Sequence, residues 1–171
     1  MAFAYYARLS KRQKAIYDKS DGVTEVRLSG AESLRPLVSA LVEALAREER
    51  TETQSACQRL LDGLTSALAV GPVRVEVLAT RPHAHWGELH GLYTEGGGAR
   101  PPKITLWMRT ARQRRVVAFR TLLRTLLHEL CHHLDYRRFR LPDSFHTEGF
   151  YKRESSLFHQ LIPEPEDDGQ P

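Results

Sequence analysis

The chain has 171 residues, of which 41% are hydrophobic and 27% are charged, as is usual for one globular domain and not for a disordered or fibrous protein. Its formal net charge of +4 is mildly basic, which permits contact with nucleic acid but does not require it. The two cysteines, Cys57 and Cys131, share no metal-ligand spacing. This excludes a cysteine-rich zinc ribbon and argues against a disulfide framework.

Hydropathy and local composition predict where the chain resides and how it is divided. No run approaches the roughly 20 apolar residues that cross a bilayer, and the short apolar start precedes the basic one, the reverse of a secretory signal. We therefore expect a cytoplasmic protein without a membrane partner. One domain is predicted over residues 1–162, with a helical part over 1–70 and a core over 73–162. The acidic, proline-rich tail 163–171 is predicted to be disordered.

Three helices are predicted in the first part of the chain. Ser10 is a candidate cap for the first helix. Ser29 together with Glu32 is a candidate cap for the second, and Thr51 with Gln54 forms a capping-box pattern for the third. The second and third segments carry apolar residues at helical spacing, so each has one buried face. The expected ranges are residues 9–20, 29–50 and 51–72.

The hydrophobic period then changes from that of a helix to that of a strand. Val73, Val75 and Val77 alternate with charged residues, which is typical of a half-buried strand. Two further strands and two helices follow, and Pro163 ends the last helix. The expected ranges are strands at 73–79, 87–95 and 102–110, then helices at 116–139 and to about residue 161. The predicted fold class is α+β, with N-terminal helices, a small mostly antiparallel sheet, a long helix and a C-terminal helix.

The long helix contains the stretch HELCH. His128 and His132 are one turn apart, so their imidazoles stack on the same side. Two neutral imidazoles at this spacing can approach one Zn²⁺ at about 2.0–2.1 Å. Glu129 lies about 100° around the helix, where it is less suited to bind the ion but can reach a metal-bound water. This H-E-x-x-H pattern supplies two zinc ligands and the general base of metalloproteases.

A catalytic zinc site needs a third protein ligand and leaves the fourth position to water. We favour His146, because SFHTEGF returns the chain to the start of the next helix. Glu154 is the rival, and it is about 12 Å of helix rise from His146, so one ion does not take both. Asp135 lies on nearly the same face as His128, where it is either a ligand or, as we favour, a hydrogen-bond partner of a histidine.

Other polar clusters have less specific interpretations. His83, His85 and His90 allow a second metal site, but a polar loop before an edge strand is favoured. Either GELHGLY or ITLWM could pair with an extended substrate by strand addition. Cys131 is interpreted as a small packing residue. The arginines near the long helix suit a solvated face, with a rim that faces nucleic acid as the alternative. They are Arg109, Arg112, Arg114, Arg115, Arg120, Arg124, Arg137, Arg138 and Arg140.

HELCHHLD followed by HTEGF resembles the SprT-like metalloprotease family, which includes the Spartan-type DNA–protein crosslink proteases. The resemblance covers about residues 73–161, and its motif residues are His128, Glu129, His132 and His146. It implies a zincin-like fold in which a small sheet precedes the active-site helix. It also implies one Zn²⁺ per chain and the activity of a zinc metalloendopeptidase.

The sequence therefore predicts a metallopeptidase in which zinc, held by the three histidines, activates a water for attack on a protein or peptide substrate. Glu129 is the predicted general base. Arg153 and Tyr151 are candidates for the residue that stabilises the oxyanion. The alternative is a zinc-stabilised protein- or nucleic-acid-binding module without proteolytic activity. Such a structural site would fill its fourth position with protein, for example with Asp135.

Overall fold

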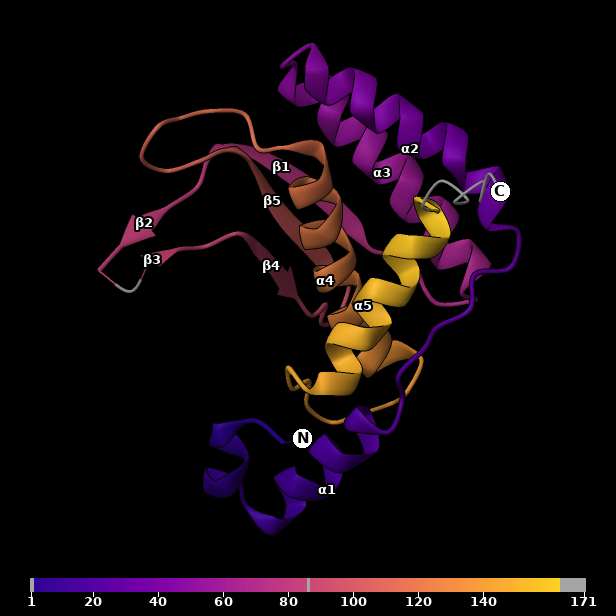
Figure 1. The fold of residues 1–171 in the computed structure, drawn as a ribbon, viewed down its shortest axis with the longest axis vertical. Coiled ribbons are helices and arrows are strands. Elements are labelled where there is room, and N and C mark those ends of the chain that lie inside the picture. Colours follow the sequence, from indigo (N-terminus) through magenta and orange to yellow (C-terminus); the bar gives the residue numbers. More distant parts are fainter. Residues whose placement is uncertain (1, 86, 164–171) are drawn as a thin grey trace, which may run out of the picture.

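The computed structural model describes residues 2–85 and 87–163 as helices layered against a small sheet (Figure 1). Residues 164–171, which make up nearly all of the predicted tail, lie outside the described residues. The helices are η1 (Ala4–Arg8), α1 (Lys11–Asp21), α2 (Ala31–Ala46), α3 (Arg50–Ala67), α4 (Phe119–Arg137) and α5 (Glu148–Leu161). The strands are β1 (Arg74–Thr80), β2 (His83–Ala84), β3 (Gly87–Glu88), β4 (Gly91–Thr94) and β5 (Lys103–Arg109). The predicted α+β class is confirmed.

The main sheet has the order β1-β5-β4. Strand β5 runs parallel to β1, with Ile104 opposite Val75, and antiparallel to β4, with Ile104 opposite Tyr93. Strands β2 and β3 form a separate antiparallel hairpin that projects from the body of the molecule (Figure 1). Two of the three pairings are antiparallel, as predicted. Since β5 is central, its middle residues are buried, and β4 lies at one edge.

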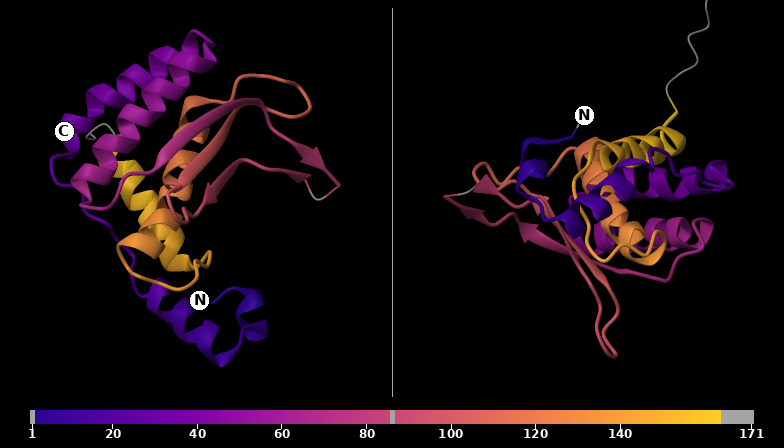
Figure 2. Two further views of the ribbon diagram at one scale, coloured as in Figure 1. Left: turned by 180° about the vertical axis from the view of Figure 1, so that it is seen from behind. Right: turned by 90° about the horizontal axis from the view of Figure 1, so that it is seen from below.

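The helices cover one side of the sheet. Helix α4 packs on β4 and β5, α3 packs on β1, and α5 packs on α4 and α2. Two further views show α2 to α5 gathered on the same side (Figure 2). The apolar face of α4 therefore forms the centre of the core. Its fully buried leucines are Leu123, Leu126, Leu127, Leu130 and Leu134.

One of the three predicted helix caps is confirmed and two are wrong. The cap at Ser10 is confirmed, because its hydroxyl accepts from the Gln13 backbone N–H and the Gln13 side chain accepts in return. The Ser29 cap is wrong: α2 follows Gly30, whose φ of +68° is left-handed, and no side chain caps it. The capping box at Thr51 is also wrong, since α3 begins at Arg50 without a side-chain cap.

Strand β1 explains the missing capping box. The side chain of Gln54 accepts from the Val77 backbone N–H at 2.9 Å, and that of Gln58 accepts from Val75 N–H at 2.8 Å. Arg50 donates to the Val77 carbonyl at 3.0 Å. Side chains of α3 thus satisfy the outer edge of β1, and Gln54 serves a strand instead of its own helix. This edge of the sheet is therefore covered.

The N-terminal segment lies away from α2 and α3 and packs against α5 (Figure 1). The Gly149 backbone N–H donates to the Asp21 carboxylate at 2.8 Å. A Cβ at Gly149 would lie 2.3 Å from the Asp21 carbonyl oxygen, so only glycine permits this approach. The contact brings residues from the beginning of the chain to the start of α5. Among the described residues, no helix is long and apolar enough to span a membrane.

Candidate metal centre

Three histidines converge at the junction of α4 and α5. His128 and His132 lie on α4, and His146 immediately precedes Thr147, whose hydroxyl caps α5. The Nε2 atom of His146 lies 3.0 Å from Nε2 of His128 and 3.0 Å from Nε2 of His132. Ligands placed tetrahedrally at about 2.0–2.1 Å from zinc are about 3.3 Å apart. The three nitrogens are therefore spaced to hold one metal ion, as the sequence predicted for this cluster.

Hydrogen bonds on the other ring nitrogens fix how the first two histidines face the centre. His128 Nδ1 lies 3.0 Å from a Glu154 carboxylate oxygen, to which it donates. His132 Nδ1 lies 2.7 Å from the Ser144 hydroxyl, which itself donates to Asp135 at 2.7 Å. Ser144 has one proton to give, so it accepts from His132. Both histidines consequently carry their proton on Nδ1 and direct an Nε2 lone pair at the centre.

These two lone pairs need a positive partner. A proton on Nε2 of His146 could satisfy only one of them, whereas a metal ion satisfies all three nitrogens. The site also favours neutral imidazoles. Burial, reinforced by His146 and His128, lowers the pKa of His132 to about 3. Burial and His128 likewise lower the pKa of His146. The donor set is therefore chemically ready to coordinate a cation at neutral pH.

Glu129 is buried beside these histidines. Burial raises the pKa of its carboxyl to about 7, and His128 and a hydrogen bond from the Tyr93 backbone oppose part of the rise. A Cβ at Gly91 would lie 2.6 Å from a carboxylate oxygen of Glu129 and 2.7 Å from Cγ2 of Thr125. Gly91 thus lets the carboxyl lie directly against β4. A carboxyl with this pKa is suited to accept and return a proton near neutrality.

The three histidines and Glu129 line one cavity of about 650 Å³. Its lining comes from the β3–β4 segment, from α4, and from Ser144, His146 and Glu154. The sequence offered two segments for pairing with an extended substrate. Because β5 is the central strand, ITLWM is excluded as that edge, whereas GELHGLY includes Gly91–Tyr93 of the edge strand β4. The metal histidines, Glu129 and this strand face one space.

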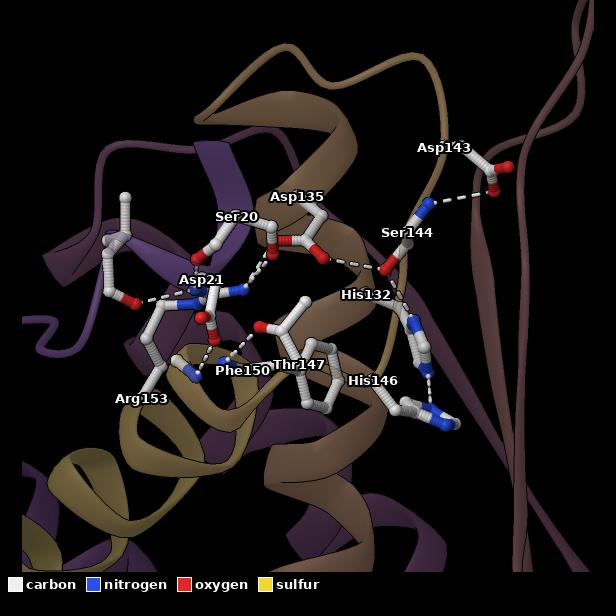
Figure 3. Close-up of polar contacts among 12 residues, drawn as sticks. Ser20, Asp21, His132, Asp135, Asp143, Ser144, His146, Thr147, Phe150 and Arg153 are labelled. Carbon is white, nitrogen blue, oxygen red and sulfur yellow. Dashed lines mark hydrogen bonds and ion pairs between the residues drawn. The ribbon is translucent and has the colours of Figure 1, made fainter. Parts of the chain in front are cut away.

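A chain of polar contacts continues behind His132 (Figure 3). Ser144 donates to Asp135, and the other carboxylate oxygen of Asp135 accepts from Arg153 at 2.8 Å. Arg153 also donates to the backbone carbonyls of Ser20 and Val23, each at 2.6 Å. The Arg153 and Asp135 side chains are both 0% exposed. The orientation of His132 is thereby connected to α5 and to the N-terminal segment.

The structure places the remaining predicted site residues in other roles. Glu154 contacts Nδ1 of His128 and Asp135 contacts Ser144, so neither belongs to the converging ligand set. Asp135 is a partner of a histidine, as favoured, but acts through a serine. The oxyanion role of Arg153 is wrong, since its side chain is fully buried in an ion pair. Tyr151 is exposed and 6.0 Å from the His128 ring, so its role stays a prediction.

The secondary polar clusters have ordinary explanations. Within residues 2–85 and 87–163, the only group of histidine, cysteine and acidic side chains that could hold a metal is the one described above. His83, His85 and His90 therefore do not form a second metal site, and the expected polar loop is in part a hairpin, because His83 lies in β2 and pairs with Glu88 of β3. Cys131 is fully buried, and burial raises its pKa, as expected of a packing residue. Several arginines form ion pairs: Arg109 with Glu48, Arg124 with Glu154 and Arg137 with Glu95.

The chain was compared with protein-family models, curated proteins and solved structures. No protein-family model, no curated protein and no solved structure matches the chain. The resemblance to SprT-like proteases therefore stays a prediction from the motif residues.

The hydrogen bond between Ser144 and His132 should strengthen metal binding, because it fixes the orientation of the ring. Replacing Ser144 by Ala removes the acceptor on Nδ1 and frees the ring to rotate or change tautomer. We expect about tenfold weaker Zn²⁺ binding, at the low end of the range for such outer contacts, measured by competition with a chromogenic chelator. Ser55→Ala, an exposed serine on α3, is the matched control. Equal affinity in both variants would show that Ser144 does not orient the ligand.

Proposed function

We propose that the chain is a zinc-dependent metallopeptidase with a zincin-like, SprT-like catalytic core. The observation that carries this proposal is the convergence of three Nε2 atoms within 4.8 Å of one another, beside the buried Glu129. A structural metal site has no need of a buried glutamate beside its ligands. A hydrolytic site needs such a group to move protons.

The donor set suits zinc in a catalytic arrangement. Three neutral imidazoles are a known catalytic zinc ligand set, which leaves a fourth position open. Bound there, Zn²⁺ would supply a Lewis acid that lowers the pKa of water and polarises a carbonyl oxygen. Glu154 and Ser144 would hold the imidazoles of His128 and His132 in place through their Nδ1 atoms. Such outer contacts raise ligand basicity and fix ring orientation.

Glu129 is assigned the proton transfers. Its carboxylate takes a proton from the water that attacks the peptide carbonyl carbon. It then delivers that proton to the amine nitrogen as the C–N bond breaks. The carboxyl is buried and lies against Gly91 of β4, so a substrate held along that strand would present its carbonyl close to the base.

The two edges of the sheet differ in a way that favours substrate binding at β4. The outer edge of β1 is satisfied by Gln54, Gln58 and Arg50 of α3. Strand β4 lies at the opposite edge and lines the cavity that contains the histidines. An extended peptide can pair with such an edge strand through main-chain hydrogen bonds. The proposed substrate is therefore a protein or peptide in extended conformation.

The alternative, a zinc-stabilised binding module, has less support. A structural zinc site fills its fourth position with a protein ligand. Within the described residues, the ligand set contains three members, and Asp135 is engaged by Ser144 and Arg153. Binding of nucleic acid by the arginines is a separate proposal that these contacts neither require nor oppose.

Glu129→Gln tests the proposal directly. The amide keeps the size of the side chain but cannot act as a base at neutral pH. We expect peptidase activity on an unfolded protein substrate to fall at least a hundredfold, with zinc content unchanged. Glu43→Gln, an exposed glutamate on α2, controls for the loss of a charge. Full activity in Glu129→Gln would refute its role as general base.

Gly91→Ala tests the position of that carboxyl. The added methyl would overlap Glu129 and Thr125, so we expect kcat to fall roughly tenfold because a displaced base loses proximity. Zinc affinity should stay that of the unmodified chain. Gly97→Ala is the control, because a Cβ there meets nothing within 4 Å. If both variants retain kcat, the close approach of β4 to Glu129 has no catalytic role.

A further inference from the structure

A second cavity, of about 520 Å³, adjoins the metal centre. It lies between η1 and the start of α5, and its lining includes Phe3, Tyr5, Arg8 and Tyr151. His146 lines both this cavity and the larger one that contains Glu129. A peptide that crosses the metal centre would therefore place a neighbouring side chain at the mouth of the second cavity.

The walls of this cavity are aromatic and partly uncovered. Phe3 is 41% exposed and Tyr151 is 42% exposed. Their rings are 6.1 Å apart in an edge-to-face arrangement, and Phe3 stacks on Tyr5 at 6.3 Å. Exposed apolar side chains that gather around a cavity mark a binding site more often than isolated ones do. Phe3 and Tyr151 therefore have exposed ring surface that a further aromatic ring can contact.

Hydrogen bonds hold part of this aromatic wall in place, and one of them joins it to His146. The Tyr5 hydroxyl donates to the His146 backbone carbonyl at 2.8 Å. The Phe3 backbone N–H donates to the Tyr17 hydroxyl at 3.1 Å. Tyr17 is 1% exposed and its ring lies 6.2 Å from that of Phe145, the residue before His146. Tyr5 and the backbone of Phe3 are therefore fixed before a ligand binds, which lowers the conformational entropy that binding costs.

We propose that this cavity is the side-chain subsite that selects the substrate: it accepts a large aromatic side chain of the peptide at one fixed position beside the scissile bond. The proposal rests on the peptidase function proposed above. An aromatic side chain fits because it can stack edge-to-face with the rings of Phe3, Tyr5 and Tyr151. Arg8 adds a guanidinium that attracts an aromatic face and repels a lysine or arginine side chain.

Binding to the subsite can be measured without any proteolysis. The probes are N-acetyl-phenylalaninamide, N-acetyl-alaninamide and N-acetyl-lysinamide, added to the full chain and followed by NMR. We expect the phenylalanine probe to shift the ring signals of Phe3, Tyr5 and Tyr151 in a saturable manner. The other two probes should leave these signals in place. Equal shifts with all three probes, or no shift with the phenylalanine probe, would overturn the subsite.

Selectivity is tested by digesting a peptide library with the zinc-loaded chain and identifying the cleaved bonds by mass spectrometry. We expect aromatic residues to be enriched at one position next to the cleaved bond. Tyr151→Ala should reduce that enrichment about tenfold, the scale at which an apolar pocket discriminates. Ala4→Trp, which fills the cavity from its wall, should abolish it. Val42→Ala, 41% exposed on the distant α2, should leave it unchanged.

The outcomes separate the two proposals. Cleavage without aromatic enrichment, or with enrichment that survives Ala4→Trp, overturns the subsite and leaves the peptidase standing. No cleavage by the zinc-loaded chain overturns the peptidase, and the substrate role of the cavity with it. Aromatic enrichment that is lost in Ala4→Trp and kept in Val42→Ala supports both.

Discussion

The buried ion pair between Arg153 and Asp135 joins the parts on which the candidate site depends. Arg153 belongs to α5 and Asp135 to α4, so their contact at 2.8 Å sets how these two helices meet. The same guanidinium binds the carbonyls of Ser20 and Val23, and the same carboxylate binds Ser144. Removal of one partner from such a pair costs about 3–5 kcal/mol, because the other charge is left buried and unpaired. The same ion pair therefore affects three features. It sets the packing of α5 on α4, holds the N-terminal segment against α5, and orients His132 through Ser144.

Different contacts hold the three histidines, and the two edges of the sheet also differ. His128 is backed by a carboxylate, Glu154, whereas His132 is backed by a hydroxyl that relays to a buried ion pair. His146 is held instead from its backbone, by Tyr5. The two edges of the sheet differ as well. Side chains of α3 cover the edge at β1, whereas the edge at β4 borders the cavity.

Sequence patterns predicted what short-range geometry determines. The one-turn spacing of His128 and His132 follows from helix periodicity, and the Ser10 cap follows from residues three apart. The roles that the sequence did not reveal for Gln54, Glu154 and Ser144 depend on distant partners, whereas the Ser29 cap fails locally because Gly30 is left-handed. Gln54 looked like part of a cap, but it pairs with β1, which comes later in the chain. Glu154 looked like a rival ligand, and only the packing of α5 on α4 places it behind His128. Nothing local to Ser144 signals its contact with His132.

The central claim is that the three histidines form one zinc site, and metal content tests it most directly. Zinc should be measured by elemental analysis on the purified chain, on His146→Ala, and on His159→Ala as an exposed control. The account predicts about one Zn²⁺ per chain in the unmodified protein and in the control, as expected for three imidazole ligands. It predicts loss of the ion from His146→Ala. Zinc retained in full by His146→Ala, or absent from the unmodified chain, would contradict the account.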